Sequence, residues 1–221
     1  RAGDADPARG GRHAEGGVAR GLHVREEEDG EGQADRHRGR REPVPVAGKA
    51  FPGEDRIVIP SNRGAPHEEH PEMKAEEITS AVIENFDKFD FCLINFANAD
   101  MLGHTGNMQA VIAGVETVDR CIARLLAIQG DDMAIIISAD HGNAEEMLDI
   151  RTGAVKTEHT SNPVPVYFIQ KNKKGDFREP LFSKKITGVL GDVAPTILKV
   201  MGLPAPAEMT GQSFLTDDFV N

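Results

Sequence analysis

Three short apolar runs constrain the fold of this 221-residue chain more than any other feature. Residues 89–96, 133–137 and 164–169 are almost continuously apolar. Strands of this kind are typical of a sheet that is buried on both faces between helices. A further short run, residues 56–60, predicts another strand that ends at a proline.

Helical patterns separate these runs. Between residue 108 and about residue 129, apolar side chains recur at intervals of three and four and predict a long amphipathic helix (Val111, Val115, Val118, Ile122 and Leu125). Residues 71–86 predict an earlier helix, and residues 192–201 predict a late helix that ends at Gly202. Strands that alternate with helices indicate a three-layer α/β sandwich with a mostly parallel sheet.

Residues 1–48 differ in composition from the rest of the chain. They contain no Ile, Met, Phe, Tyr, Lys, Ser, Thr or Asn, and their few large apolar residues show no helix or strand period. Such a segment cannot bury enough surface to offset its ordering entropy. We therefore expect residues 1–48 to be a disordered arm, or a stretch of GC-rich DNA translated out of frame, and residues 49–221 to form the folded part.

Charge and hydropathy exclude several classes of protein. A net charge of −11 argues against nonspecific binding to nucleic acid. No apolar run approaches the roughly 18 residues of a membrane helix, and the N-terminus lacks a signal-peptide pattern. Cys92 falls on a predicted strand and Cys121 on a predicted helix, so both are expected to be buried, reduced thiols. A cytoplasmic location fits these features.

Five residues of metal-binding type adjoin the predicted strands. Asp100 and His104 follow the first apolar run, Asp140 and His141 leave the second, and His159 precedes the third. Each has a simpler explanation by itself, such as a helix cap or a surface histidine. Together they predict a binuclear site at one edge of the sheet, because zinc, manganese and iron accept imidazole and carboxylate ligands. Two ions of this kind can clamp both ends of a phosphoryl transfer.

The segment between Asp100 and His104 carries signals of both a helical turn and a loop. A four-residue spacing brings Asp100 and His104 onto one face of a helical turn. Gly103 and Gly106, however, favour a loop that bends around a ligand. We expect a loop here.

The order and spacing of these segments resemble the C-terminal half of the cofactor-independent phosphoglycerate mutases, a family of the alkaline phosphatase superfamily. The resemblance covers roughly residues 49–221 and includes further segments (51–56, 71–73, 95–98, 191–196, 202–204 and 208–211). It implies an incomplete alkaline-phosphatase-like fold. It also implies that Asp100, His104 and His159 hold one Mn²⁺ and that Asp140 and His141 contribute to a second.

The resemblance carries expectations about activity. Family enzymes are isomerases of glycolysis that interconvert 3-phosphoglycerate and 2-phosphoglycerate through a metal-activated phosphoserine. The nucleophilic serine and one aspartate ligand belong to an N-terminal part of the family that has no match in this sequence. We therefore expect no catalytic nucleophile here, no activity of the chain alone, a missing N-terminal half as partner, and a monomer when complete.

Arg63 is the candidate contact to the substrate phosphate. The sequence reads Pro-Ser-Asn-Arg at residues 60–63, where the family usually carries Pro-Ser-Pro-Lys with a phosphate-binding lysine. Arginine can bind phosphate through its planar fork, although a surface arginine is an equal interpretation.

Two other functions remain open. A phosphopentomutase or phosphodiesterase relative would share the metal ligands, but the segments 71–73 and 95–98 favour the phosphoglycerate mutases. The chain could also be a non-catalytic metal-binding or interaction fragment in which residues 1–48 matter.

Overall fold

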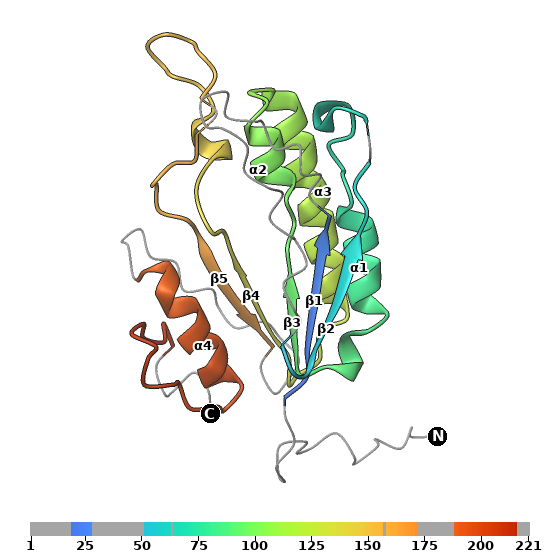
Figure 1. Ribbon diagram of the computed structural model, residues 1–221, viewed down its shortest axis with the longest axis vertical. Coiled ribbons are helices and arrows are strands. Elements are labelled where there is room, and N and C mark those ends of the chain that lie inside the picture. Colours follow the sequence, from blue (N-terminus) through green and yellow to red (C-terminus); the bar gives the residue numbers. More distant parts are fainter. Residues whose placement is uncertain (1–18, 28–50, 63, 157, 172–187, 216–221) are drawn as a thin grey trace. The chain divides into compact units, whose positions relative to one another are not determined.

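The structure is a computed structural model that describes residues 19–27, 51–62, 64–156, 158–171 and 188–215 (Figure 1). The chain divides into two compact units. Residues 1–98 and 109–122 form the first unit, and residues 99–108 and 123–221 form the second.

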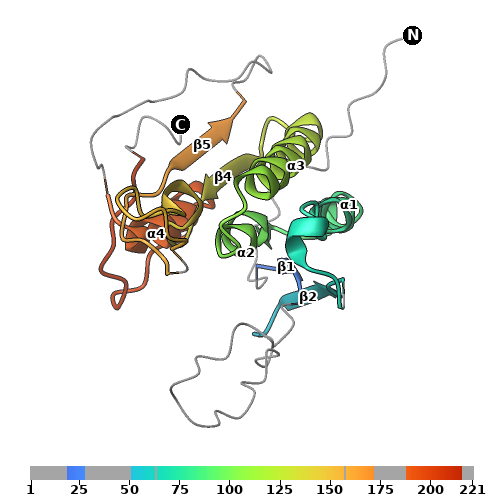
Figure 2. The ribbon, with the colours of Figure 1, turned by 90° about the horizontal axis from the view of Figure 1, so that it is seen from above.

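The first unit contains a three-stranded parallel sheet in the order β2-β1-β3. Its strands are β1 (Gly21–Glu26), β2 (Glu54–Ile59) and β3 (Phe91–Ile94). Helix α1 (Ala75–Ile83) packs along β1 and β2, and Figure 2 shows it on one face of the sheet. Most of α3 (Met108–Ala127) also belongs to this unit. The predicted parallel sheet and long helix are therefore confirmed.

Strand β1 corrects the prediction that residues 1–48 contain no strand pattern. It is the central strand of the sheet, and Leu22, Val24 and Glu26 on one face are at most 4% exposed. The alternation involves only two apolar side chains, too few to stand out among charged neighbours. Other residues of this segment lie outside the described ranges. The interpretation of them as disordered or out of frame, and the boundary near residue 49, stay predictions.

Helix α1 begins at Ala75 rather than near residue 71 as predicted. Asn98, which is 1% exposed, donates through Nδ2 to the carbonyl oxygens of Pro71 (2.8 Å) and Glu72 (3.0 Å). The buried carboxylate of Glu26 accepts the N–H of Lys74 at 3.2 Å. These long-range bonds hold residues 71–74 in a turn, and the α-helical pattern starts only beyond it.

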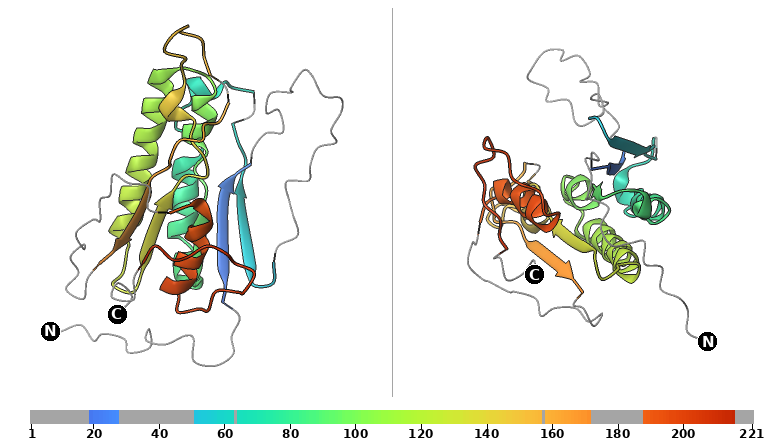
Figure 3. Two further views of the ribbon diagram at one scale, coloured as in Figure 1. Left: turned by 90° about the vertical axis from the view of Figure 1, so that its left-hand side faces the viewer. Right: turned by 90° about the horizontal axis from the view of Figure 1, so that it is seen from below.

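The second unit contains β4 (Ala134–Ser138) and β5 (Val166–Gln170), which are antiparallel and run side by side (Figure 3). It also holds α4 (Val193–Val200) and all but the first residue of α2 (Asn98–Gly103). Short 3₁₀ turns complete the two units (His67–Glu69, Phe86–Lys88, Ala144–Glu146 and Leu190–Asp192). The predicted strands and late helix are confirmed, and β4 and β5 form a separate two-stranded antiparallel sheet.

Both cysteines are free and lie on the predicted elements. Cys121 in α3 is 1% exposed, and burial raises the pKa of the Cys92 thiol in β3 to about 11. The Cys92 thiol is therefore uncharged at neutral pH. Among the described helices, none has the length and apolar character needed to cross a membrane.

Candidate metal centre

Asp100 and His104 lie on consecutive turns of one helical segment. Asp100 belongs to α2, and the N–H of His104 donates to the carbonyl of Asp100 at 3.1 Å, which continues the helical pattern by one residue. The expectation of a loop between them is therefore wrong. Gly106, with φ of 70°, forms the turn that follows. The helical turn projects both side chains toward the same point.

The antiparallel pairing of β4 and β5 brings the other candidates together. Asp140 and His141 follow the end of β4, and His159 precedes the start of β5. Antiparallel strands place the end of one beside the start of the next. Beyond the strands, the N–H of Thr160 donates to the carbonyl of Gly142 at 2.8 Å and holds the two loops against each other.

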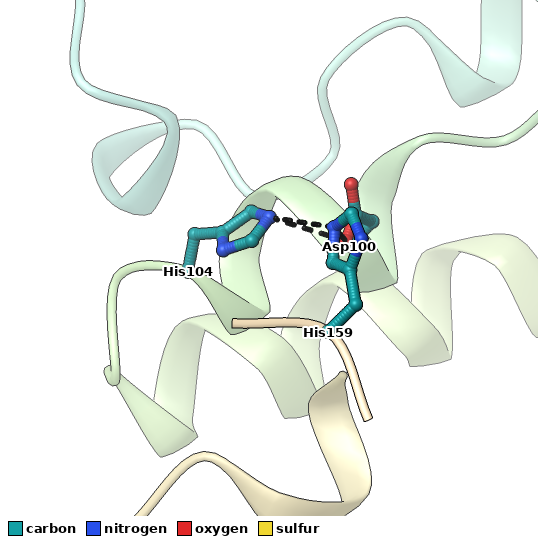
Figure 4. A group of neighbouring side chains, drawn as sticks. All are labelled: Asp100, His104 and His159. Atoms are coloured by element: carbon teal, nitrogen blue, oxygen red, sulfur yellow. Dashed lines mark hydrogen bonds and ion pairs between the residues drawn. The ribbon is translucent and has the colours of Figure 1, made fainter. Parts of the chain in front are cut away.

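Three ligand-type atoms form a nearly equilateral triangle (Figure 4). Asp100 Oδ1 lies 3.3 Å from His104 Nε2 and 3.2 Å from His159 Nε2, and the two Nε2 atoms are 3.2 Å apart. Four ligands at about 2.0–2.1 Å from a tetrahedral ion lie roughly 3.4 Å from one another. One carboxylate and two imidazoles thus have a spacing that fits a single ion. Within the described residues, this is the only group of three such side chains.

Asp140 and His141 lie beside this triangle but do not complete a second group of three. His141 Nε2 is 3.6 Å from Asp140 Oδ1, and its ring stacks on His159 with centroids 3.6 Å apart. The Asp140 side chain is 89% exposed. His141 Nδ1 is buried and has no hydrogen-bond partner in the described part of the chain. This Nδ1 faces Asp100 Oδ1 at 3.9 Å, whereas Nε2 faces the exposed carboxylate of Asp140. Nε2 and that carboxylate fit a partial ligand set that needs further donors.

Asn143, which sequence reasoning missed, contacts two of the three triangle residues. Its side chain is 5% exposed, and Nδ2 donates to Asp100 Oδ1 at 2.8 Å and lies 3.2 Å from His104 Nε2. The one available signal was its position two residues after His141. That position alone does not distinguish it from a turn residue.

Glu145, also missed, joins the two loops that carry the histidines. Its carboxylate accepts the N–H of Asn143 at 2.8 Å, Asn162 Nδ2 at 3.0 Å and the hydroxyl of Thr160. Partial burial acts to raise the pKa of Glu145, but these hydrogen bonds outweigh it, and the pKa lies below its ordinary value. Glu145 is therefore ionised at neutral pH, and its hydrogen bonds hold the two loops together beside the triangle.

Arg63, the predicted phosphate contact, lies outside the described residues, so its role stays a prediction. The neighbouring Ser61 is described, and its hydroxyl donates to Glu26 Oε1 at 2.7 Å. This bond ties the loop before Arg63 to the carboxyl end of β1.

Comparison with known proteins gives this geometry a family context. Residues 45–205 match the family model described as Metalloenzyme superfamily. The chain is 47% identical over 167 residues to the 2,3-bisphosphoglycerate-independent phosphoglycerate mutase of Moorella thermoacetica, a match that covers 75% of this chain and 31% of that protein. It is 47% identical over 174 residues to the mutase of Ruthia magnifica subsp. Calyptogena magnifica, covering 76% and 32% respectively.

The fold is likewise similar to a solved structure. A crystal structure of Leishmania mexicana phosphoglycerate mutase at low cobalt concentration superimposes with a TM-score of 0.64 and 26% identity, covering 88% of this chain and 37% of that one. The chain thus spans about a third of the length of the curated relatives that it matches.

Proposed function

This chain belongs to the metalloenzyme superfamily, and we propose that it supplies the metal-binding part of a cofactor-independent phosphoglycerate mutase. The observation that carries the proposal is the triangle of Asp100, His104 and His159, whose ligand atoms lie 3.2–3.3 Å apart. The names of the relatives favour a phosphoglycerate mutase over a phosphopentomutase or phosphodiesterase.

Asp100, His104 and His159 hold one ion in this proposal, and Asp140 and His141 contribute to a second. Two imidazoles and a carboxylate suit Mn²⁺, Zn²⁺ or Co²⁺, and we propose Mn²⁺ as the native ion from the family resemblance. Bound ions would lower the pKa of a serine hydroxyl and neutralise phosphoryl oxygens during transfer. The chain's own residues aim the two imidazoles and the carboxylate at one point.

The substrates in this proposal are 3-phosphoglycerate and 2-phosphoglycerate, and Arg63 contacts their phosphate. No segment of this chain resembles the family's nucleophile segment, so we expect the second ion and the phosphoserine chemistry to require the part of the relatives that this chain does not match. A cytoplasmic location and a monomeric complete protein are part of the same proposal.

Calorimetric titration with Mn²⁺ tests the metal site directly. We expect the wild-type chain to bind one ion and His159→Ala to lose more affinity than the roughly 10–100-fold that outer-shell substitutions cost. His67→Ala is the matched control, since His67 lies in a 3₁₀ turn of the other unit. Absence of binding by the wild-type chain, or equal binding by His159→Ala, contradicts the proposal.

A coupled assay of mutase turnover tests the expectation that this chain alone is inactive. We expect no conversion of 3-phosphoglycerate by the pure chain with saturating Mn²⁺, because the nucleophile is not among its residues. Robust conversion that survives His159→Ala would show that a different site is responsible.

A further inference from the structure

We propose that Asn143 is a positioning residue of the metal centre, one that orients Asp100 through its side-chain amide and does not itself bind the ion. The inference rests on the proposed metal-binding function of the triangle. It assigns a role to a residue that neither the ligand pattern nor the family match identifies.

The contacts of Asn143 converge on the triangle. Nδ2 donates to Asp100 Oδ1 at 2.8 Å, lies 3.4 Å from the backbone carbonyl of Asp100, and lies 3.2 Å from His104 Nε2. The side chain is 5% exposed, so water does not compete strongly for these contacts. One amide group therefore touches two of the three predicted ligands.

The other end of the same amide has no partner among the described residues. Asn143 Oδ1 is buried and accepts no hydrogen bond from any described residue. An unpaired buried carbonyl oxygen lowers the stability of a fold. If the amide were turned over, this oxygen would face the carboxylate of Asp100 with no proton between them, which is less favourable still. Asn143 is therefore not the residue that would make the fold most stable, which is often true of residues retained for function.

Gly103 leaves room for this arrangement. A Cβ at Gly103 would lie 2.4 Å from Asn143 Oδ1 and 2.8 Å from its Cγ. Any side chain there would displace the amide from Asp100. Glu145 accepts the backbone N–H of Asn143 at 2.8 Å and fixes its main chain. Gly103 therefore leaves space for the amide, and Glu145 holds the backbone that carries it.

The amide suits the task chemically. It donates to one lone pair of Asp100 Oδ1 and leaves the other free for an ion, and it does not ionise at any ordinary pH. A neutral donor orients the carboxylate without adding a second charge to the site. Outer-shell donors of this kind change metal affinity by about 10–100-fold when they are removed.

Asn143→Leu tests the proposal, because leucine has a similar shape and no hydrogen-bonding atoms. We expect Mn²⁺ affinity, measured by calorimetry, to fall about 10–100-fold. The melting temperature without metal should stay the same or rise, because the unpaired oxygen is gone. The visible absorption spectrum of the Co²⁺-loaded protein should also change, since it reports ligand geometry.

Two further variants make the result decisive. Gly103→Ala alters no ligand but displaces Asn143, so it should weaken Mn²⁺ binding in the same range. Gln129→Leu is the matched control. Gln129 is 3% exposed and donates to the carbonyls of Met133 and Ile169 at 2.9 Å, and its Oε1 has no partner in the part of the chain that the structure describes. Because Gln129 contacts no member of the triangle, Gln129→Leu should leave metal affinity unchanged.

The outcomes separate this inference from the proposed function. If the wild-type chain binds no ion, the proposed function fails and this inference fails with it. If the wild-type chain binds and Asn143→Leu binds equally well with the same Co²⁺ spectrum, the positioning role alone is overturned. A lower melting temperature with unchanged affinity also overturns it. If Asn143→Leu does not fold, Gly103→Ala decides by the same criteria.

Discussion

The imidazole rings of His141 and His159 are stacked, with centroids 3.6 Å apart and planes inclined by 14°. The resemblance to the phosphoglycerate mutases assigns these two histidines to different ions. Because the two rings stack, the predicted ligands of the two ions are in direct contact at this point. The contact arises because the end of β4 lies beside the start of β5.

His141→Ala should weaken binding of the first ion less than His159→Ala does. His141 Nδ1 lies 3.9 Å from Asp100 Oδ1, whereas His159 Nε2 lies 3.2 Å from the same oxygen. Removing His141 takes away a neighbouring ring but no member of the triangle, so we expect a loss of about 10-fold or less. Calorimetry with Mn²⁺ measures both variants. Equal losses would mean that His141 is a ligand of the first ion.

Gly142→Ala should destabilise the second unit. A Cβ at this position would lie 2.2 Å from Thr160 Oγ1 and 2.4 Å from Glu145 Oε1, where these groups clamp the two loops together. Overpacking of this kind typically costs about 1–3 kcal/mol. Urea unfolding measures the change, and Mn²⁺ affinity should fall because His159 adjoins Thr160.

Gly191→Ala is the control for Gly142→Ala. Its added Cβ would meet nothing closer than Val189 Cγ2 at 4.0 Å. It should unfold at nearly the wild-type urea concentration, and a similar loss in both variants would rule out the clamp as the cause.

Glu54 should make the first unit sensitive to acid. The hydrogen bonds from Arg56, at 2.6 and 2.8 Å, and then the N–H of Phe51 lower the pKa of Glu54 from 4.5 to about 2. Because the folded pKa is depressed, the stabilisation is fully present above about pH 4.5 and is lost as pH falls toward 2. We expect Glu54→Gln to melt at a lower temperature than wild type at pH 7 and the difference to shrink by pH 3.

Asp55→Asn is the control for Glu54→Gln. Asp55 accepts a single bond from Arg20 at 3.1 Å, and both side chains are more than half exposed. An exposed pair of this kind contributes little to stability. A pH-independent difference between Glu54→Gln and wild type would contradict the assignment to the Glu54 carboxylate.

Leu22→Ala should destabilise the first unit strongly. Leu22 is 2% exposed in the central strand of the sheet, and truncation of such a side chain costs about 2–5 kcal/mol. Leu93→Ala on the neighbouring strand is the control, since Leu93 is 49% exposed. Denaturant unfolding measures both. A negligible effect of Leu22→Ala would contradict the burial of Leu22 in β1.

Most secondary structure could be predicted because its cause is local. Helix α3 matches its predicted range within two residues, and β3, β4 and β5 each fall within or beside a predicted apolar run. Apolar spacing over 5–20 residues determines these elements. Strand β1 could not be predicted in this way. Its strand state comes from pairing with β2 on one side and β3 on the other, residues far from it in sequence.

The candidate site could likewise be predicted only in part from the sequence. Residue types and their order were enough to propose a metal site, because the chemistry of carboxylates and imidazoles does not depend on the fold. The assignment of Asp100, His104 and His159 to one ion came from the resemblance to the phosphoglycerate mutases. That Asp100, His104 and His159 actually converge required the tertiary structure, since His104 and His159 lie 55 residues apart in the chain and 3.2 Å apart in space. The roles of Asn143 and Glu145 were likewise decided only by packing, because a hydrogen bond across two loops leaves no pattern in either loop.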